Sequence, residues 1–281
     1  MANSLSSFFE AWELFRDPAL SGAVAGATLG FLGIYIALRR LVFLSAAMTQ
    51  AAGLGVMAAG LATASMGLPP LLGAPTAWAL ILSLLGAAAL RDDDRQRLSR
   101  DQRLGILYLL GAAGAILIGS QVTLDAHDVE SILFGSAVAV LPEDFRSLVA
   151  VSGLIAALHV WLVRGFLAAS FDADGARARG IPVAGLEATL LVTLALAISV
   201  STRTIGALPV FAFSTLPAIA AARVTTNLRA ALLLAASIGA AAGFGGYVAA
   251  FMWELPVGAS QAVLALVFVA VSELVRRRLR I

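Results

Sequence analysis

Long apolar runs separated by short polar turns make up most of the chain. A helix needs about 20 apolar residues to cross a hydrocarbon core of about 30 Å. Because a backbone in lipid must satisfy its own hydrogen bonds, and the runs lack the alternation of a membrane barrel, we expect helices. The pattern predicts an all-α, polytopic membrane helix bundle with about nine transmembrane helices, over residues 20–38, 41–66, 70–90, 104–122, 147–167, 186–201, 205–222, 229–253 and 259–275.

Two further apolar segments are too short or too polar to span. Residues 4–17 mix aromatic and charged side chains, which favours either a short amphipathic helix in the membrane interface or a frayed terminus. Residues 131–141 are apolar but short, and we interpret them as a re-entrant or surface helix. We therefore predict one domain over 1–281, with an interfacial helix within 1–19 and the spanning bundle over 20–276.

Composition agrees with a membrane environment. Hydrophobic residues make up 60% of the chain and charged residues 13%, whereas soluble domains carry about 45–50% and about 25%. The net charge is +2, and the arginines form short clusters between apolar runs, so nucleic-acid binding is not expected. The chain has no cysteine, which excludes disulfides and thiolate metal sites.

The arginines also predict an orientation, because short cytoplasmic loops are enriched in positive charge. With nine spans, one side carries Arg16, Arg146 and Arg203, whereas the other carries Arg39, Arg40, Arg91, Arg95, Arg97, Arg100, Arg103, Arg164, Arg177, Arg179, Arg223, Arg229, Arg276, Arg277, Arg278 and Arg280. We therefore expect the N-terminus outside and the C-terminus inside. An eight-span count would scramble this segregation.

Few residues suggest chemistry of their own. The chain lacks the GxxxxGK[ST] loop that binds ATP phosphates, and its only histidines are His127 and His159. His127 lies between Asp125 and Asp128 in an acidic outer loop, which is either a capture site for a divalent cation or a solvated loop. His159 lies within a span, where it either serves function or bonds to a neighbouring helix.

The predicted cytoplasmic stretch 170–182 is more informative. Asp172 is placed as an N-cap, and Gly180 followed by Pro182 is placed as a helix stop. A short helix between them would suit docking into a groove on a cytoplasmic partner, although a simple polar loop is the alternative. Pro209 and Pro217 are expected to break or kink the span at 205–222.

The order of five motifs carries a family resemblance over roughly residues 20–280. They are Arg-Arg-Leu-Val-Phe at 39–43 with Leu-Gly-Val at 54–56, Ile-Leu-Phe-Gly at 132–135 with Pro-Glu-Asp at 142–144, Asp-Gly-Ala-Arg-Ala-Arg-Gly at 174–180, Ile-Gly-Ala-Leu at 205–208 with Leu-Pro-Ala at 216–218 and Ala-Ala-Arg at 221–223, and Leu-Pro-Val-Gly at 255–258. In this order the chain resembles the membrane-spanning permease subunits of the bacterial ABC importers for zinc and manganese.

The resemblance implies a homodimer in the bacterial cytoplasmic membrane that imports a divalent metal ion and is not itself an enzyme. Two cytoplasmic ATP-binding subunits would bind the ATP, and a periplasmic or lipid-anchored solute-binding protein would dock outside. No cofactor is expected on this chain. The implied coupling element comprises Asp172, Asp174, Ala176, Arg177, Arg179 and Gly180, and our candidate pathway residues are Ser45, Gln50, His159 and Pro217.

Two positions depart from the family pattern. Its second helix usually reads Gly-Asp-x-x-x-His, with the Asp and His as metal ligands, and the matching positions here are Ala46 and Gln50. Its Ser-Tyr-x-x-Asp reads Ala-Phe-Met-Trp-Glu at 250–254, so Glu254 joins Asp125, His127 and Asp128 as a candidate for metal capture at the outer face. No metal ligand set is assigned within the membrane.

That departure keeps other functions open. The chain could be a non-transporting or altered-substrate relative that acts as a membrane scaffold or regulator. A secondary transporter would need an ion-coupling residue in a span, where only His159 and Glu187 are available. A membrane enzyme is least favoured, because no acid, base or metal set clusters at one depth.

Overall fold

A computed structural model describes residues 5–66, 69, 73–88, 98–121 and 140–279, and every regular element in those ranges is a helix. The helices are α1 (Leu5–Glu10), α2 (Trp12–Leu38), α3 (Val42–Met66), α4 (Pro75–Ala88), α5 (Arg100–Gly119), α7 (Pro142–Trp161), α8 (Val163–Phe171), α9 (Ala173–Ala178), α10 (Val183–Ile205), α11 (Ala207–Val224), α12 (Leu228–Trp253) and α13 (Val257–Leu279). The prediction of an all-α polytopic bundle is confirmed. The apolar stretch 131–141 lies largely outside the described residues.

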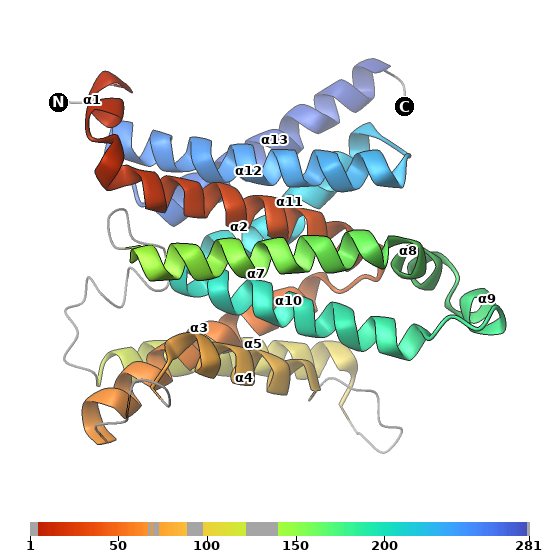
Figure 1. Ribbon diagram of the computed structural model, residues 1–281, viewed down its shortest axis with the longest axis horizontal. Helices are drawn as coiled ribbons and strands as arrows, with labels where there is room; N and C mark the ends of the chain where they lie inside the picture. The colour runs from red at the N-terminus through yellow and green to blue at the C-terminus, as the bar shows by residue number, and fades with distance from the viewer. Residues whose placement is uncertain (1–4, 67–68, 70–72, 89–97, 122–139, 280–281) are drawn as a thin grey trace.

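Eight of these helices are long and apolar enough to cross a membrane, and α4 is a shorter apolar helix. With 14 residues, α4 is about 21 Å long, and it packs against α3 and α10. Part of the span expected at 70–90 lies outside the described residues. The two termini lie at opposite ends of the bundle's long axis (Figure 1), which is the arrangement that an odd number of passes produces.

The N-terminal segment, expected as either a short interfacial helix or a frayed terminus, is helical in two pieces. It is divided at Ala11, and α2 begins at Trp12 rather than at residue 20. Phe8 is fully buried, and its ring packs 5.3 Å from that of Phe251 on α12 and 5.9 Å from that of Trp12. Aromatic packing therefore fastens this segment to the end of α12, so it is not frayed over the described residues.

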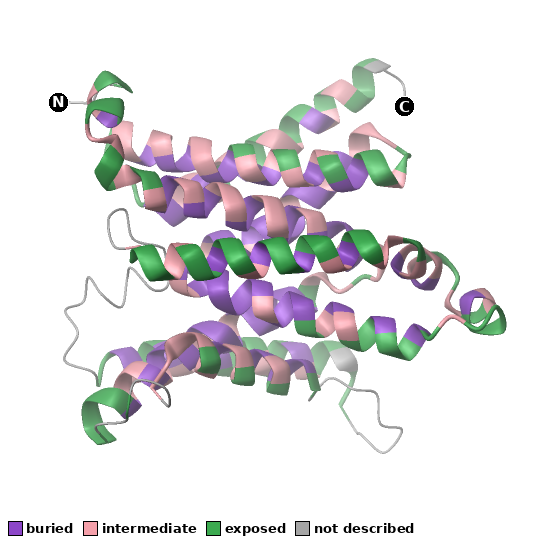
Figure 2. Ribbon diagram, viewed as in Figure 1, coloured by how far each residue is buried: buried purple, intermediate pink, exposed green. Residues whose placement is uncertain are grey.

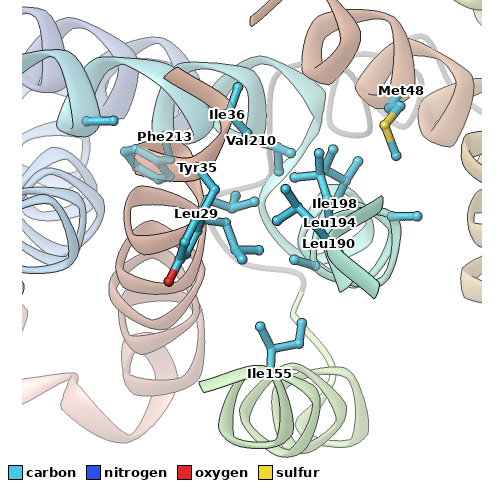
Figure 3. Packing of buried hydrophobic residues seen from close by; sticks show 14 of the residues in the cluster. Leu29, Tyr35, Ile36, Met48, Ile155, Leu190, Leu194, Ile198, Val210 and Phe213 are labelled. Carbon is cyan, nitrogen blue, oxygen red and sulfur yellow. The ribbon is translucent and has the colours of Figure 1, made fainter. Parts of the chain in front are cut away.

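The centre of the bundle is formed by α2, α3, α10 and α11, which are the most buried spans. Side chains from α2, α7, α10 and α11 meet there, including Leu29, Ile155, Leu194 and Phe213 (Figure 3). On the peripheral helices α5, α7 and α13 the outward positions are exposed (Figure 2), and many of them are large and apolar. This distribution is what a bundle surrounded by lipid requires.

Small residues explain why α2 and α12 pack so closely. A Cβ added to Gly26 on α2 would lie 2.1 Å from the carbonyl oxygen of Gly239 on α12, and one added to Gly22 would lie 2.8 Å from that of Gly243. Only glycine permits this approach of two backbones, as is common between helices in membranes. Glycines on both helices therefore allow α2 and α12 to pack backbone against backbone.

Candidate functional site

The candidate coupling element is the short helix α9, between α8 and α10. Asp172 is its N-cap, and the carboxylate Oδ1 accepts a hydrogen bond from the Gly175 amide at 2.8 Å. Gly180 has φ +76°, a left-handed conformation that favours glycine, and ends the element. The local sequence therefore folds as predicted, with the cap and the stop at the expected residues.

Most of the predicted coupling residues lie on the exposed surface of α9. Asp174, Arg177 and Arg179 are exposed; Arg177 pairs with Asp174 at 2.6 Å, and Arg179 Nε donates to the Gly175 carbonyl at 3.0 Å. Ala176 differs, because it is fully buried and packs into the hydrophobic core. Its side chain therefore holds α9 against the bundle and is not available as a docking contact.

A groove lies beside this element. A cavity of about 550 Å³ is lined by residues of α8, by the two residues that flank α9 and by the start of α12, among them Phe171, Asp172, Arg179, Leu228 and Arg229. A second cavity of about 430 Å³ shares Phe171 and Leu228 with it. The lining combines apolar side chains with one acidic residue, Asp172, and two arginines, Arg179 and Arg229, so the groove can receive a short segment with an apolar side chain and an acidic group.

Arg39 anchors the coupling element to α2. Its Nε donates to Ser170 Oγ on α8 at 3.1 Å, and its Nη1 lies 3.4 Å from Glu187 Oε1 on α10. Burial lowers the pKa of the Arg39 guanidinium, and the Glu187 carboxylate opposes that effect. An arginine nevertheless stays protonated at neutral pH, so the ion pair is present under ordinary conditions.

Two predicted pathway residues of α3 lie at different interfaces. Ser45 is buried and accepts a hydrogen bond of 3.2 Å from Ser214 Oγ on α11. Gln50 lies where α3 crosses α5, since a Cβ added to Gly111 would be 2.7 Å from the Gln50 carbonyl carbon. Within a single copy of the chain, Ser45 and Gln50 therefore do not contribute to one common site.

His159 is fully buried between α2, α7, α8 and α10. Its Nε2 lies 2.9 Å from Thr193 Oγ1, and its ring stacks on Phe166 with centroids 4.4 Å apart. This is the alternative in which the histidine bonds to a neighbouring helix. Whether it also serves the pathway stays a prediction.

Pro217 is buried inside α11, and a Cβ added to Gly30 on α2 would lie 3.2 Å from its Cβ. Neither Pro209 nor Pro217 breaks the helix, because α11 runs through both positions, and the alternative of a kink stays a prediction. Pro209 lies in the first turn, where its missing amide leaves no bond unmade. The chain is instead interrupted at Gly206, between α10 and α11.

The expected outer-face residues are only partly visible. Asp125, His127 and Asp128 lie outside the described residues. Glu254 follows α12 with φ 53° and is exposed. In the part of the chain that the structure describes, no three histidine or acidic residues are close enough to hold a metal ion, so the site they were expected to form stays a prediction.

Three ion pairs between distant residues were not anticipated from the sequence. One joins Arg39 to Glu187, a second joins Arg203 on α10 to Asp144 on α7 at 3.0 Å, and a third joins Arg223 on α11 to Glu273 on α13. The available signal was only the position of these charges at the ends of predicted spans, where a charge usually has a partner or faces water.

A bundle of long apolar helices with a capped helix projecting at one end defines a multi-pass membrane protein. Comparison makes this specific: the sequence matches the family described as ABC 3 transport family over residues 11–276, and the chain belongs to that family.

Relatives and a solved structure agree with this assignment. The chain is 27% identical to the manganese transport system membrane protein MntC of Listeria monocytogenes, over 90% of this chain and 88% of that protein. It is 28% identical to an uncharacterized membrane protein of Cyanophora paradoxa, over 92% and 84% of the two chains. PsaBC from Streptococcus pneumoniae, solved in complex with Fab, has the same fold, with a TM-score of 0.84, 24% identity and coverage of 96% and 95%.

Family membership confirms the resemblance to permease subunits of metal ABC importers. The chain is a transport subunit of the bacterial inner membrane and not an enzyme, because members of this family leave ATP hydrolysis to a separate subunit.

Proposed function

We propose that the chain is the permease subunit of an importer that moves a divalent metal ion, manganese or zinc, into the cytoplasm. A homodimer would form the pathway, and two copies of a separate ATP-binding subunit would drive it. Manganese is favoured over zinc, because MntC of Listeria monocytogenes and MntD of Bacillus subtilis are both named for manganese transport.

The observation that carries this proposal is the capped helix α9. It is only six residues long, yet it is fixed by Asp172 at one end and Gly180 at the other, while its charged residues remain exposed. A helix this short would not be stable without such fixed ends. A rigid, exposed helix beside a groove is suited to receive force from a cytoplasmic partner.

The orientation of the bundle supports the same proposal. The end that carries α9 also carries most of the arginines, including Arg40, Arg164 and Arg229, and Figure 1 places the C-terminus at that end. Positive charge marks the cytoplasmic side. The ATP-binding subunits would then bind at the α9 end, and a solute-binding protein would dock at the opposite end, near Glu254.

The metal would pass without the acidic and imidazole pair that the family usually places in its second helix. Ala46 is buried, and Gln50 offers a neutral amide. Amide and hydroxyl oxygens bind divalent cations more weakly than carboxylate or imidazole does. This favours brief passage over tight binding at that depth.

The same substitution favours the second candidate, in which the chain is a non-transporting or altered-substrate relative that serves as a membrane scaffold or regulator. Loss of strong ligands at positions 46 and 50 would remove metal transport while leaving α9 able to bind its partner. Transport and partner binding must therefore be measured separately.

The test of partner binding is co-purification with a candidate ATP-binding subunit. Ala178 is exposed on α9, so Ala178→Trp should block docking without disturbing the core. Ser147→Trp, exposed at the opposite end of the bundle, is the matched control and should leave the complex intact. Capture of the ATP-binding subunit at wild-type level by Ala178→Trp would contradict the assignment of α9.

A further inference from the structure

Arg39 forms a junction between three helices at the base of α9. It directly follows α2, its Nε donates to Ser170 Oγ on α8, and its Nη1 pairs with Glu187 on α10. Its side chain is only 11% exposed. Since α8 leads into α9 and α10 leads away from it, Arg39 holds both flanks of the coupling element to one end of α2.

A second contact lies one turn further into the bundle. Tyr35, four residues before Arg39, packs its ring 5.5 Å from that of Phe166 on α8 and 5.4 Å from that of His159 on α7. His159 in turn bonds to Thr193 on α10. Contacts therefore continue without interruption from the Arg39 junction into the middle of the bundle, along the face of α2 that meets α7, α8 and α10.

The junction resists separation for electrostatic reasons. Removing the partner of a guanidinium that is largely buried raises the free energy of the protein, because the cost of taking the charge out of water is then no longer offset. Displacement of α8 and α10 would consequently draw the end of α2 with them. The neighbouring Arg40 is exposed and forms no side-chain ion pair within the described residues, so it lacks this property.

We propose that Arg39 is a positioning residue that transmits movement of α9 to α2 through its hydrogen bond to Ser170 and its ion pair with Glu187. The proposal rests on the proposed function, since it assigns the connection through which a cytoplasmic ATP-binding subunit acts on the spanning helices. It does not require Arg39 to touch either the metal or that subunit.

The test is the amount of manganese taken up per ATP hydrolysed, in proteoliposomes that contain the whole complex. Arg39→Gln should retain the ATP-binding subunit and continue to hydrolyse ATP, but its uptake per ATP should fall about fivefold, a coupling loss of about 1 kcal/mol. Arg40→Gln is the matched control and should match the wild type.

A second pair of variants separates transmission from simple damage to the fold. Glu187→Gln removes only the half-exposed carboxylate, so it should fold and show a smaller loss in the same ratio. The charge exchange Arg39→Glu with Glu187→Arg should recover part of the ratio. A merely structural role would reduce uptake and hydrolysis together, and exchanging the charges would not restore their ratio.

The outcomes are distinct for the two proposals. If the wild type captures the ATP-binding subunit and couples transport, but Arg39→Gln and Glu187→Gln keep the wild-type ratio, the role of Arg39 is overturned and the proposed function stands. A parallel fall in uptake and hydrolysis also overturns it. If the wild type captures no ATP-binding subunit, the proposed function fails, and this inference fails with it.

Discussion

His159 Nε2 lies 2.9 Å from Thr193 Oγ1, so a buried polar contact joins α7 to α10 inside the bundle. The Thr193 hydroxyl also bonds to carbonyls of its own helix, at Thr189 and Leu190. It can therefore accept from the histidine while it donates to α10. The second ring nitrogen of His159 has no partner within the described residues, which makes Thr193 its main polar contact there.

Removing that hydroxyl should loosen the pairing of α7 and α10. Thr193→Val keeps the shape but leaves a buried imidazole unpaired, so we expect a loss of about 1 kcal/mol in unfolding free energy. Unfolding in detergent, followed by circular dichroism, measures this. Thr189→Val is the control, because the Thr189 hydroxyl bonds only within α10, to the Gly185 carbonyl. Equal stability of the two variants would show that the contact contributes nothing.

The contact of α2 with α12 should not tolerate a methyl group. Gly26→Ala would place a Cβ 2.1 Å from the Gly239 carbonyl oxygen, which forces the two backbones apart. We expect a loss of about 1–3 kcal/mol, as for other overpacked cores, measured as a lower melting temperature in detergent. Gly153→Ala has no atom within 4 Å of its new Cβ and should be neutral. A neutral Gly26→Ala would contradict this packing.

The N-cap of α9 should affect partner binding. Asp172→Ala removes the hydrogen bond to the Gly175 amide and should cost the helix about 1 kcal/mol. If α9 must be formed to dock, affinity for the ATP-binding subunit should fall about fivefold, measured by titration in detergent. Asp172→Asn caps equally well and should bind as the wild type does. Loss of binding in both variants would instead assign the carboxylate charge a direct role.

Topology can be tested cleanly because the chain has no cysteine. Single cysteines at Ala178 on α9 and at Leu255 after α12 place thiols on exposed residues of opposite ends. An impermeant thiol reagent should label Leu255→Cys in spheroplasts and Ala178→Cys only after the membrane is opened. Labelling in the reverse order would contradict the proposed orientation.

Local signals were sufficient for much of the structure. Apolar runs predicted the spans because a helix in lipid depends mainly on length and hydrophobicity, and Asp172 and Gly180 predicted α9 because caps act within a few residues. The residue type of Pro217 alone did not decide between a break and a continuous helix, since a proline in a membrane helix is tolerated when its neighbours satisfy the backbone.

Contacts between distant segments could not be predicted in this way. Ser45 and Ser214 are 169 residues apart, and Arg39 and Ser170 are 131 apart. No short pattern specifies which helix will lie beside which. The burial of Ala176 and Phe8 likewise depends on the packing of other helices and not on their own sequence surroundings.

The central claim is that this chain provides the membrane pathway of an ATP-driven metal importer. The most direct measurement is uptake of radiolabelled manganese by proteoliposomes that hold the chain, its ATP-binding subunit and its solute-binding protein. The account predicts that manganese accumulates only when ATP is supplied on the side of the membrane where the ATP-binding subunits lie. Ala178→Trp should abolish this accumulation. Stable assembly of the same complex with ATP hydrolysis, but with no uptake of manganese or zinc, would contradict it.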